Sequence, residues 1–230
     1  MGYGKMNNLN VLYEDNHIIV VEKKAGVLSQ SDITGAIDLL TIIKEYVKEK
    51  YNKPGNVYIG LVHRLDKEVG GIMVFARTSK AARRLNEEIK KHNFKKTYVA
   101  VLDGVLDKKE DTLIDYIYKD EKKRISKIVD KNYIGAKKAD LSYNIIGYKN
   151  NKTIVKVNLV TGRYNQIRVQ FKNIGYPLLG DKKYGSNKNT SLRLFAYNLS
   201  FMHPVKKELM NFKLLPRWEE LDDETIIHRL

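Results

Sequence analysis

The chain has 230 residues, of which 43% are hydrophobic, so it can form a globular core in one large domain or two small ones. It contains no cysteine, which excludes disulfide bonds, thiolate nucleophiles, zinc fingers and iron–sulfur clusters. The formal net charge of +15 favours a polyanionic partner, nucleic acid first, although a generally lysine-rich proteome would give the same composition.

Nothing in the sequence predicts export or membrane insertion. No apolar stretch reaches the roughly 20 residues that a membrane-spanning helix needs. The opening residues MGYGKMNNLN lack the apolar core of a signal peptide. We therefore expect a cytoplasmic protein without a membrane partner, folded as a single domain over residues 1–230.

The first part of the chain predicts a hairpin, a helix and two strands. A turn separates NVLYED from HIIVVEK, which predicts an antiparallel pair. Residues 38–51 predict a helix capped by Asp38, because apolar residues recur after it at helical spacing. Strands are then expected over residues 57–65 and 72–76, with the motif HRLDKEVGG lying where the first passes into the second.

The rest of the chain predicts more strands than helices. Helices are expected over 79–92 and 166–175, strands over 96–103, 192–201 and 209–216, a charged meander over 104–129, and a hairpin over 143–162 with Asn150 and Asn151 at its tip. The strands come mostly as hairpins. We therefore expect an α+β fold, with a largely antiparallel, mixed sheet and flanking helices.

Several common kinds of site are excluded by their motifs. The loop GYPLLGDK has Asp181 where a phosphate-binding loop needs lysine. The histidines show no metal-ligand spacing: they are His17, His63, His92, His203 and His228. Neither a nucleophile elbow nor a dinucleotide fingerprint is present. These exclusions favour a reaction that needs no metal and no small-molecule cofactor.

After these exclusions, two motifs remain that could supply an acid and a base. The first contains Asp66, and the second, TGRYNQIRVQF, contains Arg168. A guanidinium beside Asp66 would keep the carboxylate ionised and oriented, which makes it a usable nucleophile. Gly70 and Gly71 would let a bulky substrate approach and would tolerate positive φ. A solvated turn aspartate followed by ordinary turn glycines explains the first motif equally well.

A basic stretch follows the first motif. Residues 77–98 contain eight lysines and arginines against two glutamates, and we expect Arg83, Arg84, Lys95 and Lys96 to contact RNA phosphates. A solvated helix face is the alternative. Tyr98 ends this stretch and could stack on a base, although a lone strand tyrosine is more often part of the core.

Five motifs in order resemble one known family. HRLDKEVGG, KKTYVAVLDG, TGRYNQIRVQF, PLLGDKKYG and LRLFAYNLSFMHP are similar to those of the RluA-type RNA pseudouridine synthases, over about residues 9–218. The resemblance implies isomerisation of uridine in ribosomal or transfer RNA, after the target base is flipped out. It also implies that no cofactor is used, and we expect a monomer without an N-terminal S4 domain.

The resemblance also implies roles for individual residues. Asp66 would be the catalytic carboxylate, Arg168 its ion-pair partner and Tyr98 the ring that packs on the target base. Arg64 would enter the RNA stack where the uridine leaves. We expect further RNA contacts from the same two motifs, at His63, Lys67, Arg163, Asn165 and Gln166.

Several positions depart from the family pattern. Lys24 replaces a proline, Val69 and Gly70 replace Thr-Ser, and Asn165 and Phe195 each replace a histidine. None of these changes removes the acid, the arginine or the tyrosine, so we expect an active enzyme with altered specificity. The alternatives are an RNA-binding paralogue with impaired catalysis, and a carboxylate-dependent nuclease, for which the sequence has neither paired acids nor paired histidines at a useful spacing.

Overall fold

The computed structural model describes residues 9–185 and 189–230; residues 1–8, for which the sequence predicts no signal peptide, lie outside this description. The chain divides into two compact units, one made of residues 1–94 and 198–214 and the other of residues 95–197 and 215–230. Each unit combines two separate stretches of chain. No single linker marks the division in the sequence, and the expectation of one domain stays a prediction.

The strand pairs of the first unit described below are all antiparallel. β1 (Val11–Glu14) and β2 (Ile18–Lys23) form the predicted hairpin, and β4 (Gly70–Ala76) lies next to β2. The short β3 (Gly60–Leu61) pairs with β4, and β11 (Leu209–Lys213) pairs with β10 (Leu194–Met202). The strand order is β1-β2-β4-β10, and β10 belongs to this unit from Asn198 onward.

Both helices of the first unit begin at a side-chain cap. α1 (Leu39–Lys50) follows Asp38, whose carboxylate accepts the N–H of Thr41 at 3.1 Å. α2 (Ser79–Lys90) follows Thr78, whose hydroxyl accepts the N–H of Ala81 at 3.1 Å. Each cap satisfies an N–H that has no partner inside its helix. The predicted helix over 38–51 and the start of the next at Ser79 are therefore confirmed.

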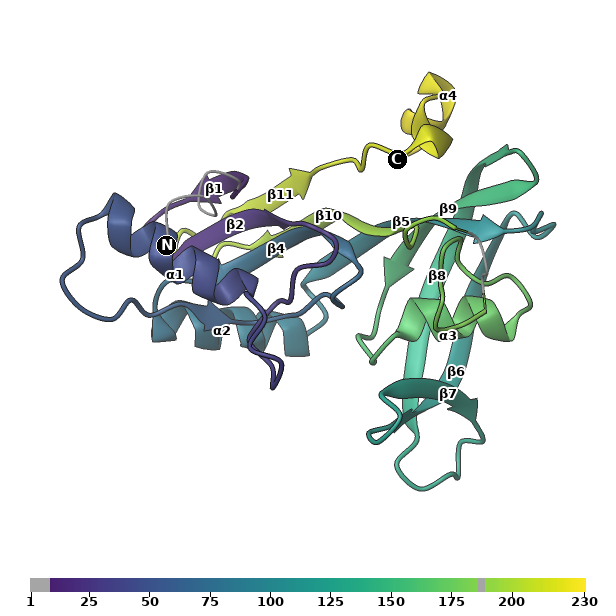
Figure 1. The fold of residues 1–230 in the computed structure, drawn as a ribbon, viewed down its shortest axis with the longest axis horizontal. Helices are drawn as coiled ribbons and strands as arrows, with labels where there is room; N and C mark the ends of the chain where they lie inside the picture. The colour runs from purple at the N-terminus through teal and green to yellow at the C-terminus, as the bar shows by residue number, and fades with distance from the viewer. Residues whose placement is uncertain (1–8, 186–188) are drawn as a thin grey trace. The chain divides into compact units, whose positions relative to one another are not determined.

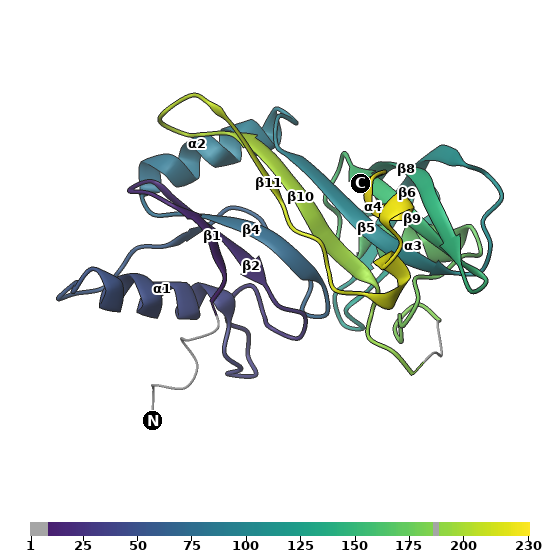
Figure 2. The same cartoon turned by 90° about the horizontal axis from the view of Figure 1, so that it is seen from above.

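The apolar core of the first unit lies where α2 covers one face of the sheet. Alternate side chains of β2 and β4 form this cluster with Ala81 and Leu85 of α2 and with Phe94: they are Ile18, Val20, Ile72, Val74 and Ala76. The intervening side chains of the two strands are also buried. Figure 2 shows β2 and β4 running between α1 and α2, which explains why residues 18–21 and 72–76 are all apolar.

The second unit contains the remaining strands of the sheet and a helix of eight residues. Its strand order is β10-β5-β9-β8-β6-β7. The bounds are β5 (Lys95–Asp103), β6 (Glu110–Asp120), β7 (Ile125–Val129), β8 (Lys137–Lys149), β9 (Lys152–Leu159) and α3 (Gln166–Asn173). Figure 1 shows α3 lying against this sheet, where it contacts β6 and β7. A 3-10 turn (Glu219–Leu221) and α4 (Glu224–Ile227) follow β11.

The sequence predicted most of these elements, but it missed the 3-10 turn and α4 after β11, and two of its expectations were wrong. The hairpin of β8 and β9 has Asn150 and Asn151 at its tip, both with positive φ, as expected. The charged meander over 104–129 is wrong, because this stretch contains β6, which pairs with β8, and β7, which pairs with β6. The polar side chains of these two strands gave no strand pattern. The strand over 57–65 is also wrong, because only β3 forms there. No helix in the described ranges is long and apolar enough to cross a membrane.

Candidate active site

Asp66 lies in a closed turn that leads into β4. Its carbonyl accepts the N–H of Val69 at 3.0 Å, and its Oδ1 accepts the N–H of Lys67 at 2.7 Å. The Asp66 side chain is half-buried, whereas those of Arg64 and Lys67 are exposed. Gly70 and Gly71 are the first two residues of β4, and Gly71 has a positive φ of 135°, which glycine tolerates. The turn therefore holds the carboxylate in a defined direction.

A buried lysine binds the backbone of this turn. Lys23, the last residue of β2, is fully buried, and its ammonium donates to the carbonyl oxygens of Val69 at 2.7 Å, Lys67 at 3.0 Å and Lys24 at 3.2 Å. Burial lowers the pKa of Lys23 to about 8, and the negative charges of Asp66 and Glu68 partly oppose this change. The Asp66 turn is thus tied to the sheet by a charged group.

Ser29 and His63 hold the segment before the turn. The Ser29 hydroxyl donates to the carbonyl of Leu65 at 2.7 Å and accepts the N–H of the same residue at 3.2 Å. His63 Nε2 accepts the N–H of Val74 in β4 at 3.1 Å, and its ring packs against Phe94. These side chains take the place of strand-to-strand hydrogen bonds, which explains why the expected strand over 57–65 is absent there.

Arg168 forms a buried ion pair within the second unit. Its Nε lies 2.8 Å from Asp181 Oδ2, and its Nη2 lies 2.7 Å from Asp181 Oδ1. Asp181 is 1% exposed and Arg168 is 5% exposed. The N–H groups of Lys183 and Tyr184 also donate to Asp181 Oδ1. The guanidinium of α3 therefore has a fixed plane, set by the loop PLLGDKKYG.

Tyr184 and Asn165 complete the surroundings of this pair. The Arg168 guanidinium lies over the Tyr184 ring, 5.2 Å from its centroid. The Tyr184 hydroxyl accepts the N–H of Ser126 at 2.9 Å and donates to Asn165 Oδ1 at 3.3 Å. Asn165 precedes α3 with a φ of 51°, a left-handed conformation that asparagine tolerates better than most residues. The replacement of histidine at this position therefore fits the local backbone.

Two predicted RNA contacts near Arg168 have structural partners. Gln166 is 3% exposed, and its amide binds the hydroxyl of Thr161, the N–H of Arg163 and the carbonyl of Asp140. Arg163 is exposed, although its Nε donates to the carbonyl of Lys138 at 2.8 Å. Gln166 thus stabilises the turn before α3, and the Arg163 side chain lies along β8.

Tyr98 belongs to the core-facing side of β5. It is 6% exposed, and burial raises the pKa of its hydroxyl above the usual value. Two residues earlier, burial lowers the pKa of Lys96, whose ammonium lies beside Gly162. Lys95 is exposed at the start of the strand. The tyrosine therefore offers a rigid apolar ring.

The basic residues of the α2 region fall into two classes. Arg77 pairs with the buried carboxylate of Glu14 at 2.9 Å, and Arg84 donates to the carbonyl of Pro204 at 2.8 Å, so both stabilise the first unit. Arg83 and Lys80 are exposed on α2. Only part of the charge counted in the sequence is therefore presented to a partner.

Sequence reasoning missed three residues of the site. Lys23 precedes Lys24, where the sequence departs from the family pattern, and Asp181 lies in the motif PLLGDKKYG, but the contacts of Lys23 and Asp181 were not predicted. Ser29 lies in no motif and had no signal. Within residues 9–185 and 189–230, no three acidic or histidine side chains are grouped as metal ligands. In chemical terms, the units supply one oriented carboxylate, one oriented guanidinium and one buried ring.

Comparison with known proteins gives one consistent result. The family described as RNA pseudouridylate synthase matches residues 17–173. Ribosomal large subunit pseudouridine synthase C of Buchnera aphidicola is 31% identical over 215 residues, which cover 88% of this chain and 65% of that protein. The chain therefore spans about two thirds of this relative.

A second relative is similar in length to this chain. The dual-specificity RNA pseudouridine synthase RluA of Haemophilus influenzae is 31% identical over 209 residues, which cover 89% of this chain and 91% of that protein. Among solved structures, human RNA pseudouridylate synthase domain containing 4 superimposes with a TM-score of 0.76 at 21% identity, covering 96% of this chain and 92% of that one. The α+β fold expected from the sequence is thereby confirmed.

Proposed function

The chain belongs to the RNA pseudouridylate synthase family, as an RluA-type isomerase, and we propose that Asp66 is the carboxylate on which its reaction depends. The observation that carries this proposal is the fixation of the Asp66 turn by the buried groups of Lys23 and Ser29. A chain seldom buries a lysine beneath a loop without need, because an ammonium is costly to desolvate. Here its hydrogen bonds hold the backbone that follows the acid, at Lys67 and Val69, and the Ser29 hydroxyl holds the preceding residue, Leu65.

The reaction needs one carboxylate and no redox partner. The bond between ribose C1′ and uracil N1 breaks, a new bond forms between C1′ and C5, the proton of C5 is lost to solvent and N1 gains a proton. An ionised Asp66 can attack the sugar, attack the uracil ring or assist elimination at the sugar. In each case, a fixed direction of the carboxylate lowers the entropic part of the barrier.

Arg168 and Tyr98 are proposed as the partners of Asp66. A guanidinium has five N–H donors, and the pair with Asp181 takes two, so the same side chain can bind a second carboxylate. The Asp181 pair would then orient Arg168 for Asp66. The buried ring of Tyr98 supplies a rigid apolar surface for the uracil.

The substrate is proposed to be ribosomal or transfer RNA. The name of the Buchnera relative places its own action on the ribosomal large subunit. The exposed basic residues of this chain, which include Arg64, Lys67, Arg83 and Lys95, can bind phosphates and offset the few kcal/mol that flipping a uridine costs.

Tritium release from RNA labelled at C5 of uracil tests the proposal. Total RNA from cells that lack this gene serves as substrate. We expect release with the wild-type protein and with Glu68→Gln, a control in the same exposed turn, and none with Asp66→Asn. Undiminished release by Asp66→Asn would refute the role of the carboxylate. Binding of this RNA by the wild type without any release would instead indicate a catalytically impaired paralogue.

A further inference from the structure

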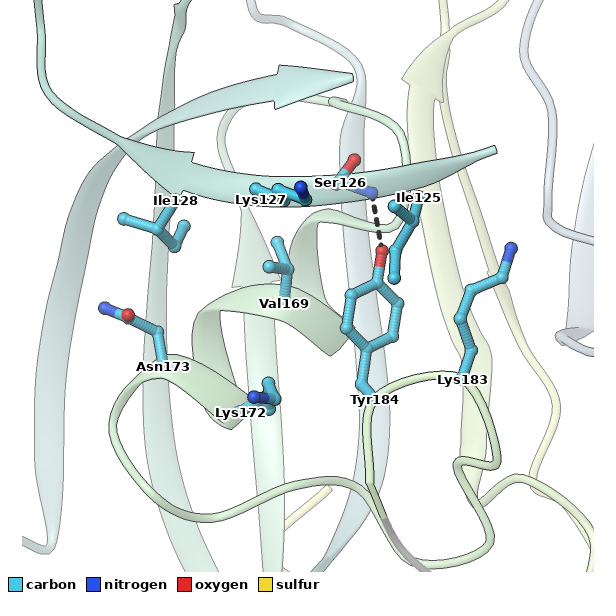
Figure 3. A pocket seen from close by; sticks show the side chains of 9 residues that line it. All are labelled: Ile125, Ser126, Lys127, Ile128, Val169, Lys172, Asn173, Lys183 and Tyr184. Carbon is cyan, nitrogen blue, oxygen red and sulfur yellow. Dashed lines mark hydrogen bonds between the residues drawn. The ribbon is translucent and has the colours of Figure 1, made fainter. Parts of the chain in front are cut away.

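The second unit contains a pocket that the proposed chemistry does not use. It has a volume of about 480 Å³ and lies between β7 and α3 (Figure 3). Its lining residues are Ile125, Ser126, Lys127, Ile128, Val169, Lys172, Asn173, Lys183 and Tyr184. In Figure 3 the strand carrying Lys127 and Ser126 closes one side, and the helix carrying Val169 closes the other. A volume of this size is within the range of small-ligand sites.

The pocket is strongly cationic. Lys127, Lys172 and Lys183 are exposed at its margin, and the lining contains no acidic residue. Lys183 donates to the carbonyl of Arg124 at 2.8 Å and lies over the Tyr164 ring, which fixes its position. Across the described ranges of the chain, neither Lys127 nor Lys172 forms an ion pair. Three ammonium groups without a carboxylate among them favour an anionic ligand.

The inner wall of the pocket is apolar. Val169 and Tyr184 are buried members of a hydrophobic cluster in this unit, and Ile125 and Ile128 pack against that cluster while remaining partly exposed. Ligands with both a flat apolar part and a negative charge match such a wall and margin. Phosphopeptide sites usually depend on arginine clusters, whereas this lining contains lysines and no arginine. A nucleotide fits the chemistry better.

We propose that this pocket binds one nucleotide of the substrate RNA other than the target uridine, with its phosphate at the lysines and its base against Ile125 and Ile128. The amide of Asn173, also in the lining, can bond the edge of the base. This inference rests on the proposed function for the identity of the ligand, and it adds a recognition site in the second unit, which does not contain Asp66.

The pocket shares a wall with the surroundings of Arg168. Tyr184 lines the pocket, its hydroxyl accepts the N–H of Ser126 in β7, and its ring packs on the Arg168 guanidinium. A nucleotide that contacts β7 and α3 together would therefore restrain Tyr184 and, through it, Arg168. When an RNA places a nucleotide in this pocket, the Arg168 guanidinium would be held in its position.

The salt dependence of RNA binding tests the charged part of the site. The probe is a fluorescent single-stranded RNA of random sequence, measured by anisotropy over a range of salt concentrations. In Lys127→Met/Lys172→Met the slope of log K against log salt should shrink by about 0.7, because the site binds one phosphate and each neutralised phosphate of a single strand contributes about 0.7. The control Lys109→Met/Lys131→Met removes the same charge from exposed residues of the same unit outside the pocket, and its slope should be unchanged.

A second variant tests the apolar wall. Ile128→Trp fills the space for the base and leaves every lysine in place, so affinity should fall at least fivefold, the equivalent of about 1 kcal/mol, with an unchanged salt slope. Thermal melting checks that each variant is folded. If Ile128→Trp unfolds the protein, Asn173→Ala replaces it and should lower affinity without changing the slope.

The outcomes separate this site from the proposed catalysis. Equal slopes for the two lysine pairs, or no binding of the RNA by the wild type, would overturn the pocket while leaving tritium release by Asp66 intact. The proposal would also be overturned if the Lys127→Met/Lys172→Met variant lost binding of uridine monophosphate but kept the wild-type salt slope for RNA. The ligand of the pocket would then be a free nucleotide. A pocket-dependent slope in a protein that releases no tritium would retain the RNA site and remove the catalytic proposal.

Discussion

Arg168 and Asp181 form a bidentate ion pair of 2.7 and 2.8 Å between two almost fully buried side chains. Breaking such a pair by removing one charge leaves the other buried without compensation, which typically costs about 3–5 kcal/mol. The pair thus links the position of a proposed catalytic side chain to the stability of the second unit.

Asp181→Asn should therefore lower both stability and activity. We expect a loss of several kcal/mol in the free energy of unfolding, measured by urea denaturation, and a lower kcat at temperatures where the protein is still folded. Asp107→Asn, an exposed aspartate in the same unit, is the matched control and should change neither quantity. If Asp181→Asn is as stable as the wild type, the Arg168–Asp181 ion pair does not stabilise the second unit.

Ser29→Ala should loosen the segment that carries Asp66. It removes the hydroxyl that binds both the N–H and the carbonyl of Leu65, whose buried polar groups then lack a partner, at a cost of about 1–3 kcal/mol. Because the carboxylate itself remains, we expect kcat to fall more than KM rises. Ser31→Ala, an exposed serine nearby, should behave as the wild type. A change in KM alone would assign Ser29 to RNA binding.

The buried ammonium of Lys23 should give stability a specific pH dependence. Burial lowers its pKa to about 8 from 10.5, so between these values the unfolded chain binds more protons than the folded chain. The Lys23 contribution to the free energy of unfolding should therefore rise with pH over this interval, by roughly 3 kcal/mol in total, and be lost as pH falls to about 8.

The difference between wild type and Lys23→Met isolates this contribution, because other groups titrate alike in both proteins. Urea denaturation at pH values across the interval gives the measurement. Lys24→Met, which removes the exposed neighbouring ammonium, should follow the wild type. If the free energies of unfolding of the wild type and Lys23→Met differ by the same amount at every pH, burial does not lower the pKa of Lys23.

Arg83 and Lys80 should contribute to RNA binding without contributing to stability. Both are exposed on α2, and Lys80→Ala/Arg83→Ala should reduce the salt slope for any RNA by roughly 1.4 for single strands. Arg84→Ala provides the contrast, because its guanidinium binds the carbonyl of Pro204, so melting temperature should fall. A slope that is the same as for the wild type would place the RNA on another surface.

The sequence alone was enough to predict the family of this protein and the motifs that carry its proposed catalytic residues. Cysteine content, charge and the order of the motifs around Asp66, Tyr98 and Arg168 predicted the family that the comparisons show. The first residues of α1, α2 and α3 and the tip of the β8–β9 hairpin were predicted as well. These features depend on neighbouring residues, through caps, spacing and turn preferences, so a linear pattern contains them.

Only the tertiary structure decided which groups hold the site. Lys23 and Ser29 reach the Asp66 turn across 46 and 36 positions of sequence, and Asp181 reaches Arg168 across 13. Contacts of Ser29 and His63 replaced the strand expected over 57–65, and pairing of β6 with β8 and of β7 with β6 made strands of their charged residues. Local propensity does not specify such partners, because burial and hydrogen bonding between distant segments outweigh it once the chain is folded.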